Sequence, residues 1–540
     1  MSNPIVRVNV NLIVAPTPDT LQRTGAFISQ GATNLAAGTY SLLTAFSDLA
    51  PLLLAPIVLA SLAWSGGVAT ATCADVGVGT GSYNGTTGLV TLTGTGPLGL
   101  VPGDPVYVAS LAGTGAFASA EGIFTCAAGT TGDVVTYFIA KALTMTISSA
   151  TGNIYATHGA SNGDTFLTTI SGATPVDYNV TVLATATSPT AFTYPLASDG
   201  GTTPATGAPA FTVRNQVELI SMATTFFGQG ANTAVYVLEL GPGEVAAGVA
   251  ALSTFINAQA QIFYAYLVPR NWDAAASFMT LMASYEAPNT KTYFYITTTT
   301  ATYTDYTDLM KCAFLQVEAP GIPLTEFSCA ADFYVLLHYR PSSTNKVTPF
   351  EYSFVFGVTP YPTKGNGALL TELSAANVSY IGTGAEGGIS DAIIFGGNYA
   401  DGNPVNFWYS VDWAQINTNL FVSNAVINGS NDPTNPLYYD QQGINRLETV
   451  AAAVMRNGIT YGLVLNPVVQ VELDADAFAQ ALDAGTYANL TVVNAIPFVD
   501  YVTENPSDYK IGLYEGFTIA YTPLRGFDQI IFNLDASNFG

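Results

Sequence analysis

Three glycines have the spacing of a dinucleotide-binding turn. Gly382, Gly384 and Gly387 form GxGxxG within IGTGAEGG, residues 381–388, after the strand-like NVSY. A dinucleotide site needs a helix directly after these glycines, because the helix N-terminus faces the pyrophosphate. The chain continues instead with ISDAIIFGGNYADGNP, which predicts a strand followed by a turn. We therefore expect no cofactor at this motif.

Potential metal ligands are few and scattered. The chain has four cysteines and two histidines, Cys73, Cys126, Cys312, Cys329, His158 and His338. They form no CxxC motif and no Cys/His cluster, so a zinc site would need long-range assembly. We expect no metal site and four small, mostly buried thiols, and the sequence leaves open a disulfide between subunits.

Paired carboxylates offer little catalytic promise. Asp474 and Asp476 open a predicted helix, DADAFAQALDAG (474–485), where positions i and i+2 face apart. Acids at a helix N-terminus more often interact with the helix dipole. The chain also lacks a P-loop, a GxSxG turn and an HExxH helix. We therefore expect no catalytic residues and a protein that is not an enzyme.

Composition restricts the class of protein further. At 540 residues the chain is expected to form three or more domains. Hydrophobic residues make up 49% and charged residues only 10%, which suggests that other subunits cover much of the surface. The net charge is −24, and no two of the 14 basic residues are adjacent. Nucleic acid is therefore not expected as a partner.

Neither a secretion signal nor a membrane span is expected. The N-terminus lacks a basic region followed by an apolar one. The most apolar run, LAPLLLAPIVLASLAW (49–64), has 16 residues and contains Pro51 and Pro56. It is shorter than a membrane span and lacks basic flanks, so we expect a buried core segment.

An internal repeat lies in a Gly- and Thr-rich region, residues 65–215. Residues 87–117 are echoed by residues 151–178, and both copies contain a Gly-Asp turn, at Gly103-Asp104 and Gly163-Asp164. Strands recur every 8–12 residues. This pattern predicts two tandem all-β modules, at about 80–141 and 142–215.

Helices and strands alternate after Val217. Strands are predicted at 232–240, 261–269 and 290–300, with helices at 244–258 and 272–287 between them. This βαβαβ order favours a mostly parallel sheet covered by helices.

A compact α+β unit is predicted near the C-terminus. A helix at 444–458 is expected to stop at Gly458 as its C′ residue. Strands are expected at 461–473, 488–502 and 514–524.

Each end of the chain reads as a half-buried strand. Valines and a leucine alternate with polar residues in PIVRVNVNLI (4–13), and apolar residues alternate in RGFDQIIFNLDASNFG (525–540). The apolar faces are Val6, Val8, Val10, Leu12, Ile530, Phe532 and Leu534. These strands could pair within their own domain or be donated to neighbouring subunits, and the pattern alone does not choose.

The layout resembles the contractile tail sheath proteins of bacteriophages, over roughly residues 1–60 and 216–540. The similarity is best in FGGNYADGNPVNFWYSVDWAQINTNL (395–420) and DQQGINRLETVAAAVMRNGITYG (440–462). The family's turns and helices would correspond to Gly396-Gly397, Asp401-Gly402, Asp412-Trp413 and the helix stopping at Gly458. The insertion lies early, near residue 65, where some sheaths carry theirs later.

The resemblance implies a multidomain α+β and α/β protein: an α/β core, a terminal α+β domain, an inserted pair of small all-β modules, and extended N- and C-terminal strand arms. The implied domains are an arm at 1–20, a core at 21–64 and 216–450, the β modules at 65–215, a C-terminal domain at 451–525 and an arm at 526–540. It favours strand donation by both arms, with hinges at Pro16, Pro18, Pro523 and Gly526.

The resemblance also implies a function and partners. The family forms a homo-oligomeric helical sheath around a tail tube, with baseplate and tail terminator proteins as further partners, in a virion tail assembled in the host cytoplasm. Residues 474–484 are candidates for facing the tube. Two other classes stay open: another phage or surface-array protein, such as a tail tube, baseplate or S-layer component, and a glycan-binding hydrolase or adhesin.

Overall fold

The computed structural model describes residues 18–147, 152–160, 162–212, 216–243, 245–259, 262–306, 310–320, 326–362, 366–384 and 391–527. The chain divides into two compact units, each described by itself. The sheet unit comprises the described residues within Thr24–His338 and Phe350–Asn403, and the C-terminal unit comprises those within 18–23, Tyr339–Pro349 and 404–527.

A six-stranded sheet forms the centre of the sheet unit, in the order β2-β17-β1-β18-β19-β20. Only β2 runs antiparallel to its neighbour, and the other pairs are parallel. The predicted βαβαβ order is confirmed. The strands are β1 (Gly25–Ser29), β2 (Thr39–Leu43), β17 (Val235–Glu239), β18 (Ala265–Leu267), β19 (Tyr293–Thr298) and β20 (Ala313–Val317).

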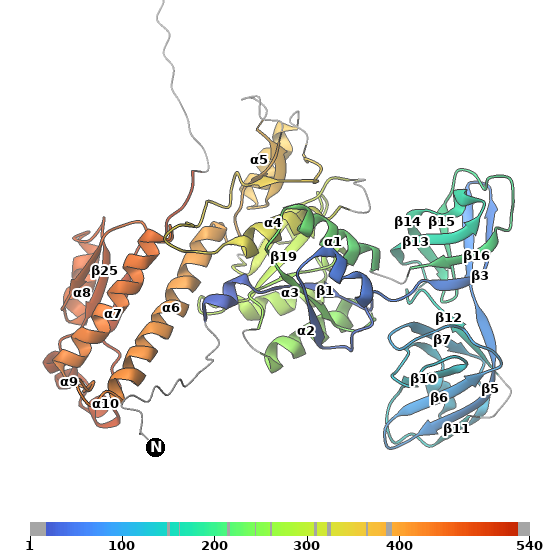
Figure 1. Cartoon of the computed structure of the whole chain (residues 1–540), viewed down its shortest axis with the longest axis horizontal. Coiled ribbons are helices and arrows are strands. Elements are labelled where there is room, and N and C mark those ends of the chain that lie inside the picture. Colours follow the sequence, from blue (N-terminus) through green and yellow to red (C-terminus); the bar gives the residue numbers. More distant parts are fainter. Residues whose placement is uncertain are drawn as a thin grey trace, which may run out of the picture. The chain divides into compact units, whose positions relative to one another are not determined.

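Helices cover both faces of this sheet (Figure 1). They are α1 (Gln216–Gly228), α2 (Val245–Ala258), α3 (Ala276–Met282) and α4 (Ser328–His338). Apolar side chains of β1 point to both faces of the sheet, so both faces need a layer of helices. Ala26 and Ile28 join the apolar cluster of α2 and α3, whereas the Phe27 ring lies 5.3 Å from Phe226 of α1 and 6.1 Å from Phe333 of α4.

The inserted region forms two β structures that share one apolar core. A closed barrel has the order β13-β14-β15-β4-β3-β16. A six-stranded sheet has the order β10-β6-β5-β12-β7-β9, and β8 pairs with β11 beside it. The barrel strands are β3 (Ile57–Ser65), β4 (Val68–Cys73), β13 (Thr165–Thr174), β14 (Thr181–Ser188), β15 (Ala191–Pro195) and β16 (Thr206–Phe211). The remaining strands are β5 (Asp75–Asn84), β6 (Leu89–Gly94), β7 (Pro105–Ala109), β8 (Gly113–Gly115), β9 (Gly122–Thr125), β10 (Val134–Phe138), β11 (Met145–Ile147) and β12 (Asn153–Ala156).

The expectation of two tandem modules is wrong. In the sequence, the segment that forms the open sheet is inserted between two strands of the barrel, so we call it the nested sheet. Strands β5 to β12 lie between the barrel strands β4 and β13 in the chain, and β4 pairs with β15 across this insert. The second copy of the repeat therefore contributes β12 to one structure and β13 to the other. The two Gly-Asp turns are real local features, since Gly103 and Gly163 have φ of +100° and +92°.

The apolar run 49–64 is a half-buried strand rather than a fully buried segment. It holds the short turn Ala50–Leu52 and most of β3. Ile57, Leu59 and Leu62 are buried, whereas Val58 is 51% exposed. A barrel wall has one interior face, so its strands alternate.

A three-stranded sheet with the order β21-β23-β22 and the helix α5 complete the sheet unit. The elements are β21 (Phe354–Val355), α5 (Gly367–Ala375), β22 (Tyr380–Thr383) and β23 (Ala392–Phe395). Gly382 of the GxGxxG motif lies within β22, Gly387 lies outside the described residues, and β23 follows as the predicted strand.

The C-terminal unit packs two long helices and three short ones around a three-stranded sheet with the order β24-β25-β26 (Figure 1). Its elements are α6 (Val405–Ser430), α7 (Gln441–Thr460), β24 (Val468–Val471), α8 (Ala475–Asp483), β25 (Thr491–Ala495), α9 (Phe498–Glu504), α10 (Pro506–Ile511) and β26 (Phe517–Ala520).

The prediction that the long helix stops at Gly458 is wrong. Helix α7 continues to Thr460, and the left-handed C′ residue is Gly462, with φ of +78°. The N–H of Leu463 donates to the Gly458 carbonyl and that of Gly462 to the Ile459 carbonyl, a Schellman arrangement. Gly458 serves packing instead, because a Cβ there would lie 2.6 Å from Val464 Cγ2.

The strand expected at 488–502 is also too long. Strand β25 ends at Ala495, and Pro497 then forms the N-cap of α9. The fixed φ of proline suits the start of a helix and cannot supply a strand N–H.

Candidate assembly surfaces of the C-terminal unit

The small C-terminal sheet has two open edges in the described part of the chain. The central strand β25 pairs in parallel with β24 and antiparallel with β26. Within the residues that the structure describes, no strand pairs with the outer edge of β24 or of β26. Each outer edge therefore presents a row of backbone donors and acceptors, which is the template for adding a further strand.

Packing buries the central strand of this sheet. All five residues of β25 are buried, whereas β24 and β26 are half-exposed. Helix α7 lies against β24 and β25. The Asn494 side chain fixes the chain beyond β24, since its Oδ1 accepts from the Leu473 N–H at 3.0 Å and its Nδ2 donates to the Leu473 carbonyl at 3.1 Å.

The last described residues are anchored beside this sheet. Pro523 forms a β-bridge with Val464. The N–H of Leu524 donates to the Leu463 carbonyl at 3.0 Å, and a Cβ on Gly526 would lie 2.6 Å from Pro349. Phe527, the last described residue, is 74% exposed.

The first described residues are anchored to the same unit. Pro18 begins a 3-10 helix, Pro18–Arg23. The Gln22 side chain donates to the Tyr409 carbonyl of α6 at 2.9 Å. Both terminal segments thus start from the C-terminal unit. The arm and hinge residues Val6, Val8, Val10, Leu12, Pro16, Ile530, Phe532 and Leu534 lie outside the described residues.

The motif residues of the sequence resemblance have structural roles. Gly396, Gly397 and Gly402 have positive φ, and the Asp401 Oδ1 accepts from the Asn403 N–H at 2.9 Å in the turn before α6. Asp412 and Trp413 are buried in α6. These residues shape the entry to α6 and its packing against α7.

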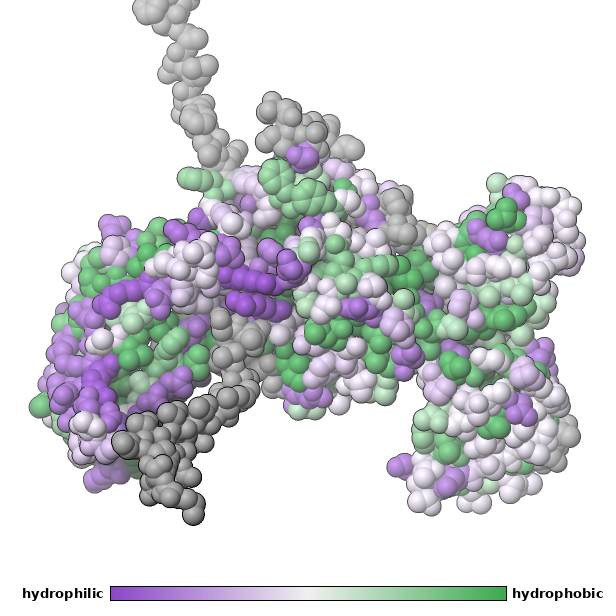
Figure 2. Space-filling view, viewed as in Figure 1, coloured by the Kyte–Doolittle hydropathy of each residue, from purple (hydrophilic) through white to green (hydrophobic). Residues whose placement is uncertain are grey.

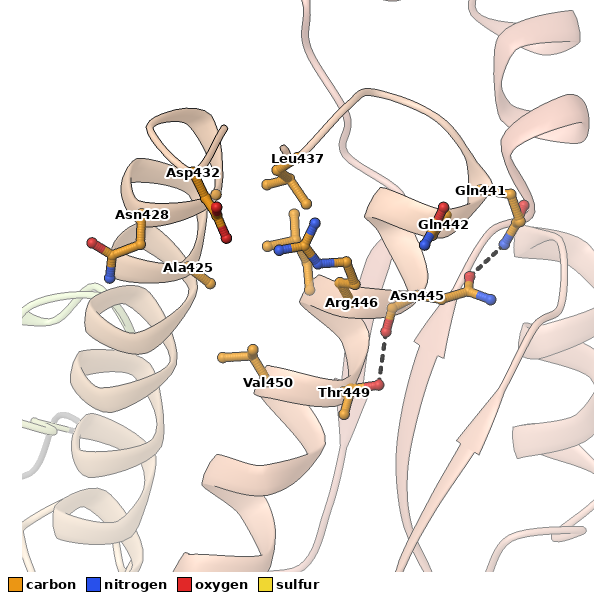
Figure 3. A pocket seen from close by; sticks show the side chains of 12 residues that line it. Ala425, Asn428, Asp432, Leu437, Gln441, Gln442, Asn445, Arg446, Thr449 and Val450 are labelled. Atoms are coloured by element: carbon orange, nitrogen blue, oxygen red, sulfur yellow. Dashed lines mark hydrogen bonds between the residues drawn. The ribbon is translucent and has the colours of Figure 1, made fainter. Parts of the chain in front are cut away.

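A groove of about 830 Å³ opens between α6 and α7. Figure 3 shows Ala425 of α6 opposite Val450 and Arg446 of α7. Its lining combines the apolar side chains of Ala425, Leu437 and Val450 with the amide side chains of Asn428, Gln442 and Asn445. A lining of this kind offers both apolar contacts and hydrogen-bonding groups to a ligand.

The loop that closes one end of this groove is held by Arg446. Its Nη1 donates to the carbonyls of Asn435 and Pro436 at 3.2 and 3.1 Å. Asp432 stands nearby, and hydrogen bonds from the backbone of Thr434 and Asn435, with the charge of Arg446, lower the pKa of its carboxyl. Sequence reasoning missed this groove, because no local pattern predicts which faces of α6 and α7 leave a gap when the two helices pack.

Ionisable groups also gather in the interior of the sheet unit. The Arg270 Nε and Nη2 donate to the two carboxylate oxygens of Glu318, both at 2.7 Å, and Nη2 donates to the Glu326 carbonyl at 2.7 Å. Glu218 lies 3.6 Å away, and the guanidinium stacks 4.3 Å from the Phe327 ring centroid. The Arg270 guanidinium thus faces the carboxylates of Glu318 and Glu218 within a packed core, which is typical of a structural ion pair.

The cysteines are confirmed as buried thiols, Cys73, Cys126, Cys312 and Cys329. Burial raises the pKa of Cys73 and of Cys126 to about 12, so both stay protonated and unreactive. Within the described ranges, no group of three or more His, Cys, Asp or Glu side chains could hold a metal ion. Among the described helices, none combines the length and apolar character needed to cross a membrane.

No family model matches this chain, and no curated protein matches it in sequence. Solved structures similar to it include a chain of the anti-feeding prophage (AFP) baseplate, with a TM-score of 0.38 and 12% identity over 59% of this chain and 80% of that chain. A chain of the AFP helical sheath in its contracted state has a TM-score of 0.37 and 11% identity over 59% and 81%. A sheath tail protein from Desulfitobacterium hafniense has a TM-score of 0.33 and 9% identity over 85% and 91%. The sheath proteins among them are of the class that the sequence resembles.

Proposed function

We propose that this protein is the structural subunit of a contractile phage tail sheath. It polymerises helically around an inner tube and contracts to drive the tube through the host envelope. The observation that supports this proposal is the C-terminal sheet, whose two outer edges, on β24 and β26, are open in the described part of the chain. Strands added by neighbouring copies would complete this sheet of three short strands.

The terminal segments fit the role of donated strands. Both begin at the C-terminal unit, at Pro18 and after Gly526. Their sequences alternate between apolar and polar residues, as a half-buried added strand requires. We assign the N-terminal arm to residues 4–13 and the C-terminal arm to residues 528–540. Each would add to the open-edged sheet of a neighbouring copy.

Contraction in such an array draws on inter-subunit contacts. With no nucleotide motif in the sequence, the work comes from an extended array relaxing to one with more buried contact. The units then move as rigid bodies while the donated strands stay paired. The hinges lie near Pro16 and Pro18 and near Gly526. Pro523 itself is held in the bridge to Val464, so bending at the C-terminal end is expected after Gly526.

The remaining assignments follow from this role. Apart from the two tandem modules, the domain divisions drawn from the sequence belong to the proposal, with the inserted β structures as an outward decoration. Partners are further copies, a tail tube protein, and baseplate and tail terminator proteins. Residues 474–484, which include the acidic start of α8, would face the tube. The protein would reside in a virion tail assembled in the host cytoplasm, and it would have no catalytic activity.

Deleting either arm tests the proposal. Chains lacking residues 1–14 or 528–540 should fold as monomers, with an unchanged circular dichroism spectrum, and should form no tubes in negative-stain electron microscopy. The cut at 528 keeps Gly526 and its contact with Pro349 intact. A control variant is Phe138→Ala, since Phe138 is 59% exposed on β10 and belongs to neither arm segment.

Two outcomes would contradict the proposal. Normal tubes from either truncated chain would remove that arm from the assembly. Flat lattices from the intact chain would identify a surface-array protein instead, because a sheath forms tubes that shorten and widen.

A further inference from the structure

One face of the nested β sheet carries an aromatic row that the assembly role does not use. Tyr155 of β12 pairs with Tyr107 of β7 on one side and with Asp75 of β5 on the other. Tyr107 in turn pairs with Ile123 of β9. The four residues therefore form one row across four strands, on a single face of the sheet.

This face points away from the core. The residues that alternate with the row, Val106, Val108, Ile154 and Ala156, are buried. In the row itself, Ile123 is 40% exposed and Asp75 is also exposed, while the two tyrosines are half-buried. The tyrosine ring centroids lie 5.6 Å apart with an angle of 39° between the planes, so the rings form a tilted platform.

Polar groups beside the platform are fixed in position. Asn153, two residues before Tyr155 on β12, uses its Nδ2 to donate to Asp75 Oδ2 and to the Tyr155 hydroxyl, both at 3.1 Å. Among the described residues, no protein donor reaches Asn153 Oδ1 or Asp75 Oδ1. Both oxygens can therefore accept from a ligand without rearrangement of the side chains.

Small residues flank Asn153 in the row next to the platform. Asn153 pairs with Gly77 on β5 and with Ala109 on β7. The Thr95 side chain lies beside Gly77, where a Cβ would meet its Oγ1 at 3.5 Å. A ligand resting on the rings is therefore expected to reach the amide and the carboxylate from the side of Ala109. The site thus combines an apolar platform with a few placed polar groups, as small-molecule sites do.

Charge decides which ligand fits. Within residues 75–156 the single basic residue is Lys141, against the acids Asp75, Asp104, Glu121 and Asp133. Figure 2 shows a surface of near-neutral hydropathy over the β modules on the face in view. Anionic ligands such as phosphates and acidic sugars are disfavoured. A pyranose ring offers a C–H face to the electron-rich tyrosine rings and hydroxyl donors to Asn153 and Asp75.

We propose that this face of the nested sheet binds a neutral carbohydrate, with Tyr107 and Tyr155 as the stacking platform and Asp75 and Asn153 as hydrogen-bond partners. The simpler alternative is that the tyrosine pair only stabilises the sheet, as cross-strand aromatic pairs do. The proposal does not depend on assembly into a sheath.

Affinity electrophoresis of the full-length protein in gels containing soluble neutral polysaccharides tests this directly. The probes are a β-1,4-glucan, a β-1,4-linked N-acetylglucosamine polymer, an α-mannan and a galactan, with heparin as the anionic comparison. We expect retardation by at least one neutral polymer and none by heparin. Tyr107→Ala and Tyr155→Ala should each weaken binding about tenfold, and Asp75→Asn should weaken it less.

Two further variants separate binding from folding. Tyr107→Phe keeps the ring in the sheet and should retain most of the binding. Phe138→Ala removes an exposed ring of the same module, on β10, and should leave binding unchanged. The proposal fails if none of the four neutral polymers retards the protein, if heparin does, or if folded Tyr107→Ala and Tyr155→Ala proteins bind as tightly as the unaltered chain.

Discussion

Asp104 shows how a single buried carboxyl can set a pH dependence. It is 3% exposed in the turn before β7, where burial raises its pKa to about 6 although the Val101 N–H donates to Oδ2 at 2.9 Å. In the unfolded chain, an aspartate side chain ionises near pH 4. Between about pH 4 and pH 6 the unfolded state therefore loses its proton first, and folding stability falls as pH rises.

Asp104→Asn should remove this fall in folding stability between pH 4 and pH 6. The variant cannot ionise, so its advantage over the unaltered chain should grow from pH 4 to pH 6 and then stay constant, at about 2–3 kcal/mol. Thermal unfolding of the full chain at pH 4, 5, 6 and 7.5 measures this. Asp48→Asn is the opposite control, because hydrogen bonds from Thr44 and Ala45 lower the pKa of Asp48 and stabilise its charged form. An Asn advantage that is independent of pH would contradict the prediction.

Arg270 is expected to matter for stability far more than an exposed arginine. Arg270→Ala leaves Glu218 and Glu318 without their cation in a packed site, so it should cost about 3–5 kcal/mol. Arg270→Lys should cost less but still more than 1 kcal/mol, since lysine cannot form the two parallel bonds to Glu318. Urea unfolding followed by fluorescence measures both.

Arg456 supplies the comparison for Arg270. It makes one hydrogen bond, to Gln470 Oε1 at 3.1 Å, on an exposed face of α7. Arg456→Ala should change stability by no more than about 0.5 kcal/mol. Equal costs at the two arginines would show that the core ion pair contributes nothing beyond a surface contact.

At the scale of elements, the end of α7 depends on two glycines with different tasks. Gly462 supplies the left-handed conformation, and Gly458 supplies the space that Val464 and Trp413 occupy. Gly458→Ala should cost about 1–3 kcal/mol, because the new Cβ would lie 2.6 Å from Val464 Cγ2 and 3.1 Å from the Trp413 ring.

Gly228→Ala is the matched control for Gly458→Ala. Gly228 ends α1, has no left-handed φ, and a Cβ there would meet nothing within 4 Å. Its replacement should be neutral or stabilise the protein by up to about 1 kcal/mol. Chemical unfolding of both variants settles the comparison, and a loss at Gly228 as large as at Gly458 would refute the packing account.

Local sequence patterns predicted individual helices and strands well, but they predicted poorly which elements pack or pair with one another. The strands β17, β18 and β19 and the helix α2 follow directly from their periodicity. The predicted helix end at Gly458 was wrong, because sequence alone cannot distinguish a glycine that ends a helix from one that allows close packing. The open-edged sheet and the α6–α7 groove arise from the way separate elements pack together, for which no local signal exists.

At the scale of the whole molecule, nesting decides where the chain can be cut. The Gln216 side chain donates to the Leu54 carbonyl at 2.7 Å, so the two ends of the inserted region meet. Replacing residues 56–212 with a short Gly/Ser linker should leave a soluble, folded protein. Circular dichroism and gel filtration check this, and aggregation would contradict it.

A cut at the composition boundary should behave differently. Replacing residues 65–215 leaves β3 without its partners β4 and β16 and exposes Ile57, Leu59 and Leu62. That variant should aggregate. The difference could not be foreseen from composition, because β3 belongs to the apolar run before the Gly-rich region, while its pairing partners β4 and β16 lie within that region.

The position of β1 at the centre of the main sheet has a consequence for how the protein is made. Its two neighbours, β17 and β18, are synthesised roughly 200 residues later. At about 5–20 residues per second, Ala26, Phe27 and Ile28 stay uncovered for roughly 10–40 s while the inserted modules fold first. Ribosome-bound chains arrested before Val235 should therefore bind a chaperone that holds apolar segments, and chains arrested well after Val317 should release it.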